Sequence, residues 1–151
     1  MKIVIGCDPN AVAFKQELIP YIKDLGHSVT DFGSDDSIYA NMAIRVAEVV
    51  VSKEYDRGIL ICGTGIGVAI AANKVPGAYV ATVSNVYQAQ RAALSNDANI
   101  IAMGAQVTGI ELAKMMVEEY LRNTFDPHSR SVPKVQRIKE YEQAHLRRDV
   151  D

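Results

Sequence analysis

The sequence predicts an α/β fold of the doubly wound type, in which helices cover both faces of a five-stranded parallel sheet. Short apolar segments rich in Ile and Val alternate five times with segments whose apolar residues recur every three or four positions. Such alternation is typical of parallel strands joined by right-handed helical crossovers. The predicted strands are 2–7, 27–32, 58–62, 78–83 and 99–103, and the predicted helices are 11–25, 38–52, an alanine-rich helix after the third strand, 86–94 and 109–122.

Local signals support several of these boundaries. Pro20 is expected to kink the first helix and Gly26 to end it. A polar loop at 33–36 precedes the second helix. Thr108 and Glu111 have the spacing of a capping box, which predicts that the helix 109–122 begins there.

The last segment differs from the rest. A polar, proline-containing break at 126–132 precedes a charged helix at 134–146 with few apolar positions. We expect the segment 126–151 to pack on a partner subunit, so that this helix lies at the subunit interface. The length is typical of one domain, and no internal repeat or linker divides the chain, so a single domain 1–151 is predicted.

Composition narrows the function classes. Hydrophobic residues make up 48% of the chain, which excludes disorder, and the net charge of −2 suggests neither a nucleic-acid nor a membrane partner. No signal-peptide core and no apolar run of membrane-spanning length are seen, so we expect a cytoplasmic protein. Cys7 and Cys62 are in no metal-ligand spacing, and we expect both to be reduced and no metal to be bound.

The segment 57–74 contains the most informative motif. Cys62 ends the third predicted strand, and a glycine-rich turn, 63–67, leads into the alanine-rich helix. Glycines allow a close backbone approach to a ligand, and the N–H groups of a first helical turn favour negative charge. With a strand order of 2-1-3-4-5, Asp8 and Cys62 would flank the crevice where ligands bind in such folds.

This motif suits removal of a proton next to a carbonyl. A Cys62 thiolate would act as the base, and backbone N–H groups would stabilise the enediolate that forms. Thr64 could relay a proton or merely stabilise the loop, and Cys62 could instead be a small buried apolar residue. The motif lacks P-loop spacing and matches the dinucleotide fingerprint only in part, which disfavours nucleotide binding.

Several segments resemble type B ribose-5-phosphate isomerases and the related galactose-6-phosphate isomerase subunits. These are KIVIGCD, GHSVTDFG, DRGILICGTGIGVAIAANKVPG, NDANIIAMGA and TGIELAK, within residues 2–125, and ICGTGIG and NDAN are the most specific. The resemblance implies a Rossmann-like fold and active sites shared between the chains of a homodimer, or of a dimer of dimers. It also implies reversible aldose–ketose isomerisation with no metal or organic cofactor.

The resemblance assigns roles to individual residues. Cys62 inherits the role of the base that moves a proton between C1 and C2, and Thr64 assists proton transfer between the oxygens. The remaining matches are the enediolate-binding Gly63, Gly65 and Gly67, and the sugar-lining Asp8, Tyr39 and Asn96. Capping by Asp8 or Asn96, and packing by Tyr39, are the alternative roles of these side chains.

Three positions depart from the family pattern. Pro9 stands where a histidine usually follows the aspartate, and Gln106 stands where an arginine is usual. Ser95 replaces the histidine thought to open the sugar ring. Phosphate contacts and the ring-opening group are therefore altered.

Positive charge is retained near the end of the chain. Arg130 and Lys134 align with two family arginines and would supply charge-assisted donors to a phosphate. His128 is a candidate to compensate for the missing histidine, although a lone loop histidine is more often solvated.

The favoured function is an aldose–ketose isomerase that acts on a small sugar phosphate, and the loss of the ring-opening histidine suggests a tetrose phosphate. Three alternatives stay open. The chain could be the cysteine-bearing subunit of a two-chain galactose-6-phosphate isomerase, an isomerase of a non-phosphorylated sugar acid, or a non-catalytic sugar-binding paralogue.

Overall fold

The computed structural model describes residues 1–33 and 35–146, and it shows a five-stranded, all-parallel sheet with helices on both faces. The strands are β1 (Lys2–Cys7), β2 (Ser28–Asp31), β3 (Arg57–Cys62), β4 (Val80–Thr82) and β5 (Ile100–Gly104). The helices are α1 (Val12–Asp24), α2 (Tyr39–Val51), α3 (Ile66–Ala72), α4 (Val86–Leu94), α5 (Ile110–Arg122) and α6 (Val132–Leu146), and a 3-10 turn covers Pro9–Ala11. The predicted Rossmann-like α/β fold is confirmed.

The strand order is β2-β1-β3-β5-β4, so the predicted order 2-1-3-4-5 is wrong in its last two strands. All five residues of β5 are buried, whereas β4 has three residues that are only partly buried or exposed. A parallel strand that is apolar on both faces is best placed inside the sheet, which leaves the short β4 at the edge. The winding still reverses between β1 and β3, so the crevice predicted beside Asp8 and Cys62 is retained.

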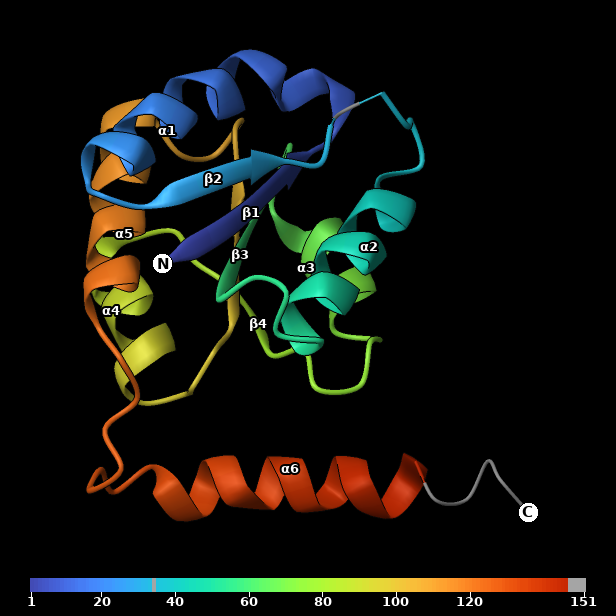
Figure 1. Cartoon of the computed structure of the whole chain (residues 1–151), viewed down its shortest axis with the longest axis vertical. Helices are drawn as coiled ribbons and strands as arrows, with labels where there is room; N and C mark the ends of the chain where they lie inside the picture. The colour runs from blue at the N-terminus through green and yellow to red at the C-terminus, as the bar shows by residue number, and fades with distance from the viewer. Residues whose placement is uncertain (34, 147–151) are drawn as a thin grey trace.

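Alternate residues of the buried strands serve two separate cores. Ile59 and Ile61 pack with α1, α4 and α5 on one face, and Leu60 and Cys62 pack with α2 and α3 on the other (Figure 1). Cys7 belongs to the first core and Cys62 to the second. The two thiols therefore lie on opposite faces of the sheet, and they form no disulfide with each other.

One local prediction needs correction. Thr108 does not cap α5, because Gly109 is the N-cap and no side chain makes a capping hydrogen bond. Thr108 is buried and lies one residue before the N-cap position, and the Glu111 carboxylate pairs with Lys114 instead. Pro20 lies inside α1, exposed to solvent, and the helix continues past it.

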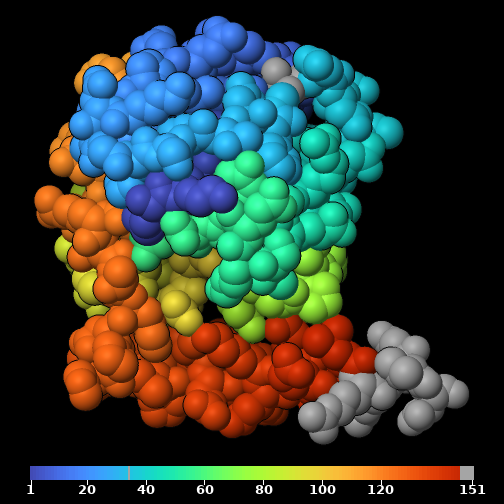
Figure 2. Space-filling model, viewed as in Figure 1, coloured from blue at the N-terminus to red at the C-terminus, as the bar shows by residue number. Residues whose placement is uncertain are grey.

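Helix α6 stands apart from the two layers and runs along one end of the molecule (Figures 1 and 2). It begins earlier than predicted, because Pro133 fits in a first helical turn. Val135 is its one buried residue among those described. Packing of 126–151 on a partner stays a prediction, and residues 147–151 lie outside the described part. No described helix is long and apolar enough to cross a membrane.

Candidate active site

Strand β3 brings Cys62 to the carboxyl end of the sheet. The side chain is only 5% exposed, and its Sγ accepts a hydrogen bond from the Gly65 N–H at 3.1 Å. Cys62 is paired in register with Gly104 of β5, and its carbonyl accepts a hydrogen bond from the Ala105 N–H at 2.9 Å. The thiol is thus fixed by the sheet on one side and by its own loop on the other.

The loop after Cys62 lies directly against the backbone of β5. Gly65 has φ +79, and a Cβ at this position would be 2.8 Å from the carbonyl carbon of Met103. A Cβ on Gly104 would in turn be 2.6 Å from the backbone of Thr64. Only glycine fits at these two positions, which holds the loop and its N–H donors in place.

Tyr39 and Thr64 lie at the same loop. Tyr39 begins α2, and a Cβ added to Gly67 would clash with its hydroxyl and ring, so the Tyr39 side chain lies over Gly67. Thr64 is exposed, and its hydroxyl accepts a hydrogen bond from the Ile66 N–H at 3.3 Å. The loop-stabilising role of Thr64 is therefore present, while its role in proton transfer stays a prediction.

Asp8 follows β1 and lies next to β3. Its N–H donates to the Ile61 carbonyl at 2.9 Å, and its carboxylate accepts from the Asn10 N–H at 2.7 Å. Asp8 thus caps the short turn that Pro9 begins. The capping role is observed, and a sugar contact by the same side chain stays a prediction.

Gln106 lies against the loop that follows Cys62. Its N–H donates to the Gly63 carbonyl at 3.0 Å, and a Cβ on Gly63 would be 3.2 Å from its Oε1. The Gln106 side chain therefore lies over Gly63, two residues beyond the end of β5. Its carboxamide makes no hydrogen bond to another residue that the structure describes, so it remains available to a ligand.

The other predicted residues cluster elsewhere. Ser95 ends α4 and is nearly buried, whereas Asn96 is exposed and helps to line a hollow of about 280 Å³ that also borders Ile138. The Asp126 N–H donates to the Leu94 carbonyl at 3.3 Å, which brings the break before α6 next to the end of α4.

Lys134 lies in the first turn of α6, and His128 and Arg130 lie in the turn before it; all three are exposed. The His128 N–H donates to the Asp126 carboxylate at 2.9 Å, but its ring makes no hydrogen bond to a described residue. These three residues thus follow the Asp126 turn that contacts α4.

The predicted site therefore divides into two half-sites. We name the group at the carboxyl ends of the strands, Asp8, Tyr39, Cys62, loop 63–67 and Gln106, the Cys62 half-site. We name Ser95, Asn96, His128, Arg130 and Lys134 the Asn96 half-site.

The two half-sites lie at opposite ends of the sheet. Asn96 precedes β5, and Gly104, beside Thr64, ends it. A five-residue strand spans about 16 Å. Arg57, which begins β3, donates to the carbonyls of Tyr120 and Asn123, so the chain also leaves α5 at the amino ends of the strands. One chain does not bring its own half-sites together.

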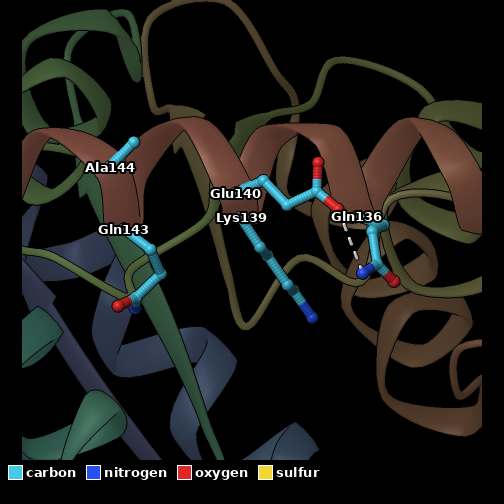
Figure 3. A pocket seen from close by; sticks show the side chains of 5 residues that line it. All are labelled: Gln136, Lys139, Glu140, Gln143 and Ala144. Atoms are coloured by element: carbon cyan, nitrogen blue, oxygen red, sulfur yellow. Dashed lines mark hydrogen bonds between the residues drawn. The ribbon is translucent and has the colours of Figure 1, made fainter.

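A hollow of about 480 Å³ on α6 contains none of the predicted site residues. Lys139 and Gln143 extend from one side of the helix, and the Gln136 amide donates to Glu140 at 3.2 Å (Figure 3). Ala144 completes the lining. No cluster of three or more His, Cys, Asp or Glu side chains that could hold a metal ion occurs in residues 1–33 and 35–146.

Comparisons with known proteins agree over nearly the whole chain. Residues 3–138 match the Ribose/Galactose Isomerase family. The chain is 46% identical to "D-erythrulose-4-phosphate isomerase 2" of Mycolicibacterium smegmatis, over 95% of this chain and 99% of that protein. It is 45% identical to "Ribose-5-P isomerase B" of Listeria innocua, over 95% of this chain and 98% of that protein.

Solved structures give the same result. The ribose-5-phosphate isomerase B of Clostridium thermocellum superposes with a TM-score of 0.89 at 42% identity, over 96% of this chain and 99% of that one. The type B ribose 5-phosphate isomerase of Trypanosoma cruzi superposes with a TM-score of 0.91 at 36% identity, over 96% of this chain and 100% of that one. The chain therefore belongs to the ribose/galactose isomerase family of sugar-phosphate isomerases, and it is an aldose–ketose isomerase.

Proposed function

We propose that this isomerase moves a proton between neighbouring carbons of a small sugar phosphate, with Cys62 as the base. The Cys62 thiolate takes the proton from the carbon next to the carbonyl, and the C–H electron pair forms the enediolate. The thiol then returns the proton to the neighbouring carbon, which was the carbonyl carbon. The contact of Sγ with the Gly65 N–H, at the point where the winding reverses, is the observation that carries this proposal.

Backbone donors and Thr64 complete the chemistry. The N–H groups of the loop that ends at Gly67 are held against β5, so they need little rearrangement to stabilise negative charge on the enediolate oxygens. The Thr64 hydroxyl is exposed and could pass a proton from one of these oxygens to the other. Tyr39 and Asp8 then contact the sugar hydroxyl groups.

We propose a tetrose phosphate as the preferred substrate. The C4 oxygen of a tetrose 4-phosphate is esterified, so this sugar cannot close a five-membered ring and needs no ring-opening group. Ser95, in place of the family's histidine, suits such a substrate. The relatives from M. smegmatis and Pectobacterium atrosepticum that carry the name D-erythrulose-4-phosphate isomerase, 46% and 41% identical, support this choice. Ribose 5-phosphate is the second candidate, since the L. innocua relative is named for it.

We further propose that each active site combines the Cys62 half-site of one chain with the Asn96 half-site of another. The support is the separation of the half-sites in one chain, together with the exposed apolar Ile66 and Ile70 on α3, just beyond the catalytic loop. In a two-fold dimer, each chain would give its Arg130 and Lys134 to its partner's substrate phosphate. Each chain would form one domain, 1–151, with 126–151 on its partner.

An isomerase assay on the purified chain tests the function. Wild type and Cys62→Ala are compared on tetrose, pentose and hexose phosphates and on a sugar acid. We expect the highest kcat/KM with a tetrose phosphate, and its loss in the variant. A preference for a ring-closed hexose phosphate would contradict the proposed substrate. Ligand-induced melting shifts without product would indicate a binding paralogue, and activity only with a second homologous chain would indicate the two-chain enzyme.

A further inference from the structure

Two side chains of α6 attach this helix to the segments that precede β4 and β5. The Glu142 carboxylate accepts from the Gly77 N–H at 3.0 Å through Oε1, and from the Tyr79 hydroxyl at 2.7 Å through Oε2. One turn earlier, the Lys139 ammonium contacts the Asp97 carboxylate at 2.7 Å. We name Tyr79, Asp97, Lys139 and Glu142 the α6 clasp.

The clasp leads directly to the Asn96 segment. Asn99 donates from Nδ2 to the Gly77 carbonyl at 2.9 Å and accepts from the Tyr79 N–H at 2.9 Å. The turn at 77–79 is therefore held by Glu142 on one side and by Asn99 on the other. Asp97, the residue after Asn96, has φ +53, a conformation that depends on its surroundings to persist.

Apolar packing alone does little to fix the position of α6. Val135 is its one buried described residue, and Ile138 and Tyr141 are more than half exposed. The Lys139–Asp97 pair is also partly exposed, with side-chain exposures of 45% and 39%, so it adds little to stability. The directional contacts of the clasp instead define where the helix lies.

The Tyr79 hydroxyl is a dependable donor in this arrangement. Burial and the hydrogen bond to Glu142 raise the pKa of Tyr79 to about 12. The Lys139 ammonium also lies over its ring, 5.7 Å from the centroid. The clasp thus joins both α6 side chains to one aromatic residue.

We propose that Lys139 and Glu142 are positioning residues that hold Asn96 and the start of α6 together as one rigid half-site. This inference rests on the proposed function, in which Asn96, Arg130 and Lys134 contact the substrate of a partner chain. Lys139 and Glu142 do not touch the substrate themselves. Because contacts to a phosphate distant from the reacting carbons act equally on bound substrate and transition state, their misplacement raises KM and leaves kcat nearly unchanged.

Steady-state kinetics of Lys139→Met and Glu142→Ala test this role. We expect KM for the preferred sugar phosphate to rise about 5- to 20-fold, with kcat within about threefold of wild type. Lys139→Arg and Glu142→Gln, which keep the hydrogen-bonding groups, should restore KM to within about twofold. Glu140→Ala is the matched control, because Glu140 lies on the same helix and bonds only Gln136 among the described residues.

A folded and active Lys139→Met enzyme with unchanged KM would overturn the inference. A lower melting temperature with no change in KM, or a fall in kcat alone, would also overturn it, because a contact that only stabilises the fold has these effects. A wild-type enzyme that is inactive on all the sugars tested would contradict the proposed function instead. Amide hydrogen exchange then decides: faster exchange at 96–99 in Lys139→Met, but not in Glu140→Ala, supports the inference, and unchanged exchange overturns it.

Discussion

The two half-sites are built by different means. The Cys62 half-site is set by the backbone: strand register places the thiol, and Gly65 and Gly104 press the loop against β5. The Asn96 half-site is set by side chains, through Lys139 and Glu142 on a helix that buries one described residue. In the proposed function, the chemistry occupies the rigid end of the sheet. Substrate selection would then fall to the end where single side chains can change the geometry.

The largest expected effect is at the thiol. Replacing Cys62 by Ala removes the proposed general base, so kcat should fall at least about 100-fold while KM changes little. Steady-state kinetics on the preferred sugar phosphate measure this loss, and circular dichroism checks the fold. A Cys62→Ala enzyme with wild-type turnover would refute the cysteine mechanism.

The rigidity of the Cys62 half-site can be tested at Gly65. A Cβ there meets the Met103 backbone at φ +79, so Gly65→Ala should lower the free energy of unfolding by about 1–3 kcal/mol and reduce kcat. Denaturant unfolding gives the free energy. Gly109→Ala is the control, since nothing lies within 4 Å of its added Cβ. Equal effects at both glycines would count against a rigid loop.

A smaller effect is expected at Gln106, which lies over Gly63 and whose carboxamide bonds no described residue. Gln106→Arg adds a cation beside the loop that follows Cys62 and should lower KM for sugar phosphates roughly five- to tenfold. KM for a neutral sugar serves as the control and should not fall. The same decrease for both sugars would show that Gln106 does not face the phosphate.

The smallest effect concerns the α6 clasp at high pH. Tyr79 has a folded-state pKa of about 12 against an ordinary value of 10, so unfolded chains lose this proton first. Its contribution to stability is therefore complete below pH 10 and is lost as the pH rises toward 12. Between pH 10 and 12, the free energy of unfolding should therefore fall more steeply in wild type than in Tyr79→Phe, as denaturant unfolding would show. Parallel curves would contradict the assignment.

The sequence predicts the placement of Cys62 and of the loop after it, because the signals for both are local. The buried strands β1, β3 and β5 are found to within one residue, and the glycine turn follows Cys62 directly along the chain. The order of the last two strands is wrong in the sequence prediction, because both segments are apolar; the complete burial of β5 beside the partly exposed β4 identifies the inner strand.

The contacts of the Asn96 half-site could not be predicted, because they join distant segments. Tyr79 and Glu142 are 63 positions apart, and Asp97 and Lys139 are 42 apart. Within its own segment, none of these four residues belongs to a motif that points to the contact. The packing of Gln106 over Gly63 also joins distant segments, and the sequence shows only that this position departs from the family pattern.

Mixing two impaired variants tests the central claim, that each site needs both half-sites from different chains. Cys62→Ala and Asn96→Ala chains are unfolded together in equal amounts and refolded, and the isomerase rate is measured at a substrate concentration far below KM, where loss of the Asn96 contact also lowers the rate. Random pairing makes half of the dimers mixed, and each mixed dimer holds one intact site, so about a quarter of wild-type activity should return. A mixture no more active than the mean of the two variants alone would contradict the shared site.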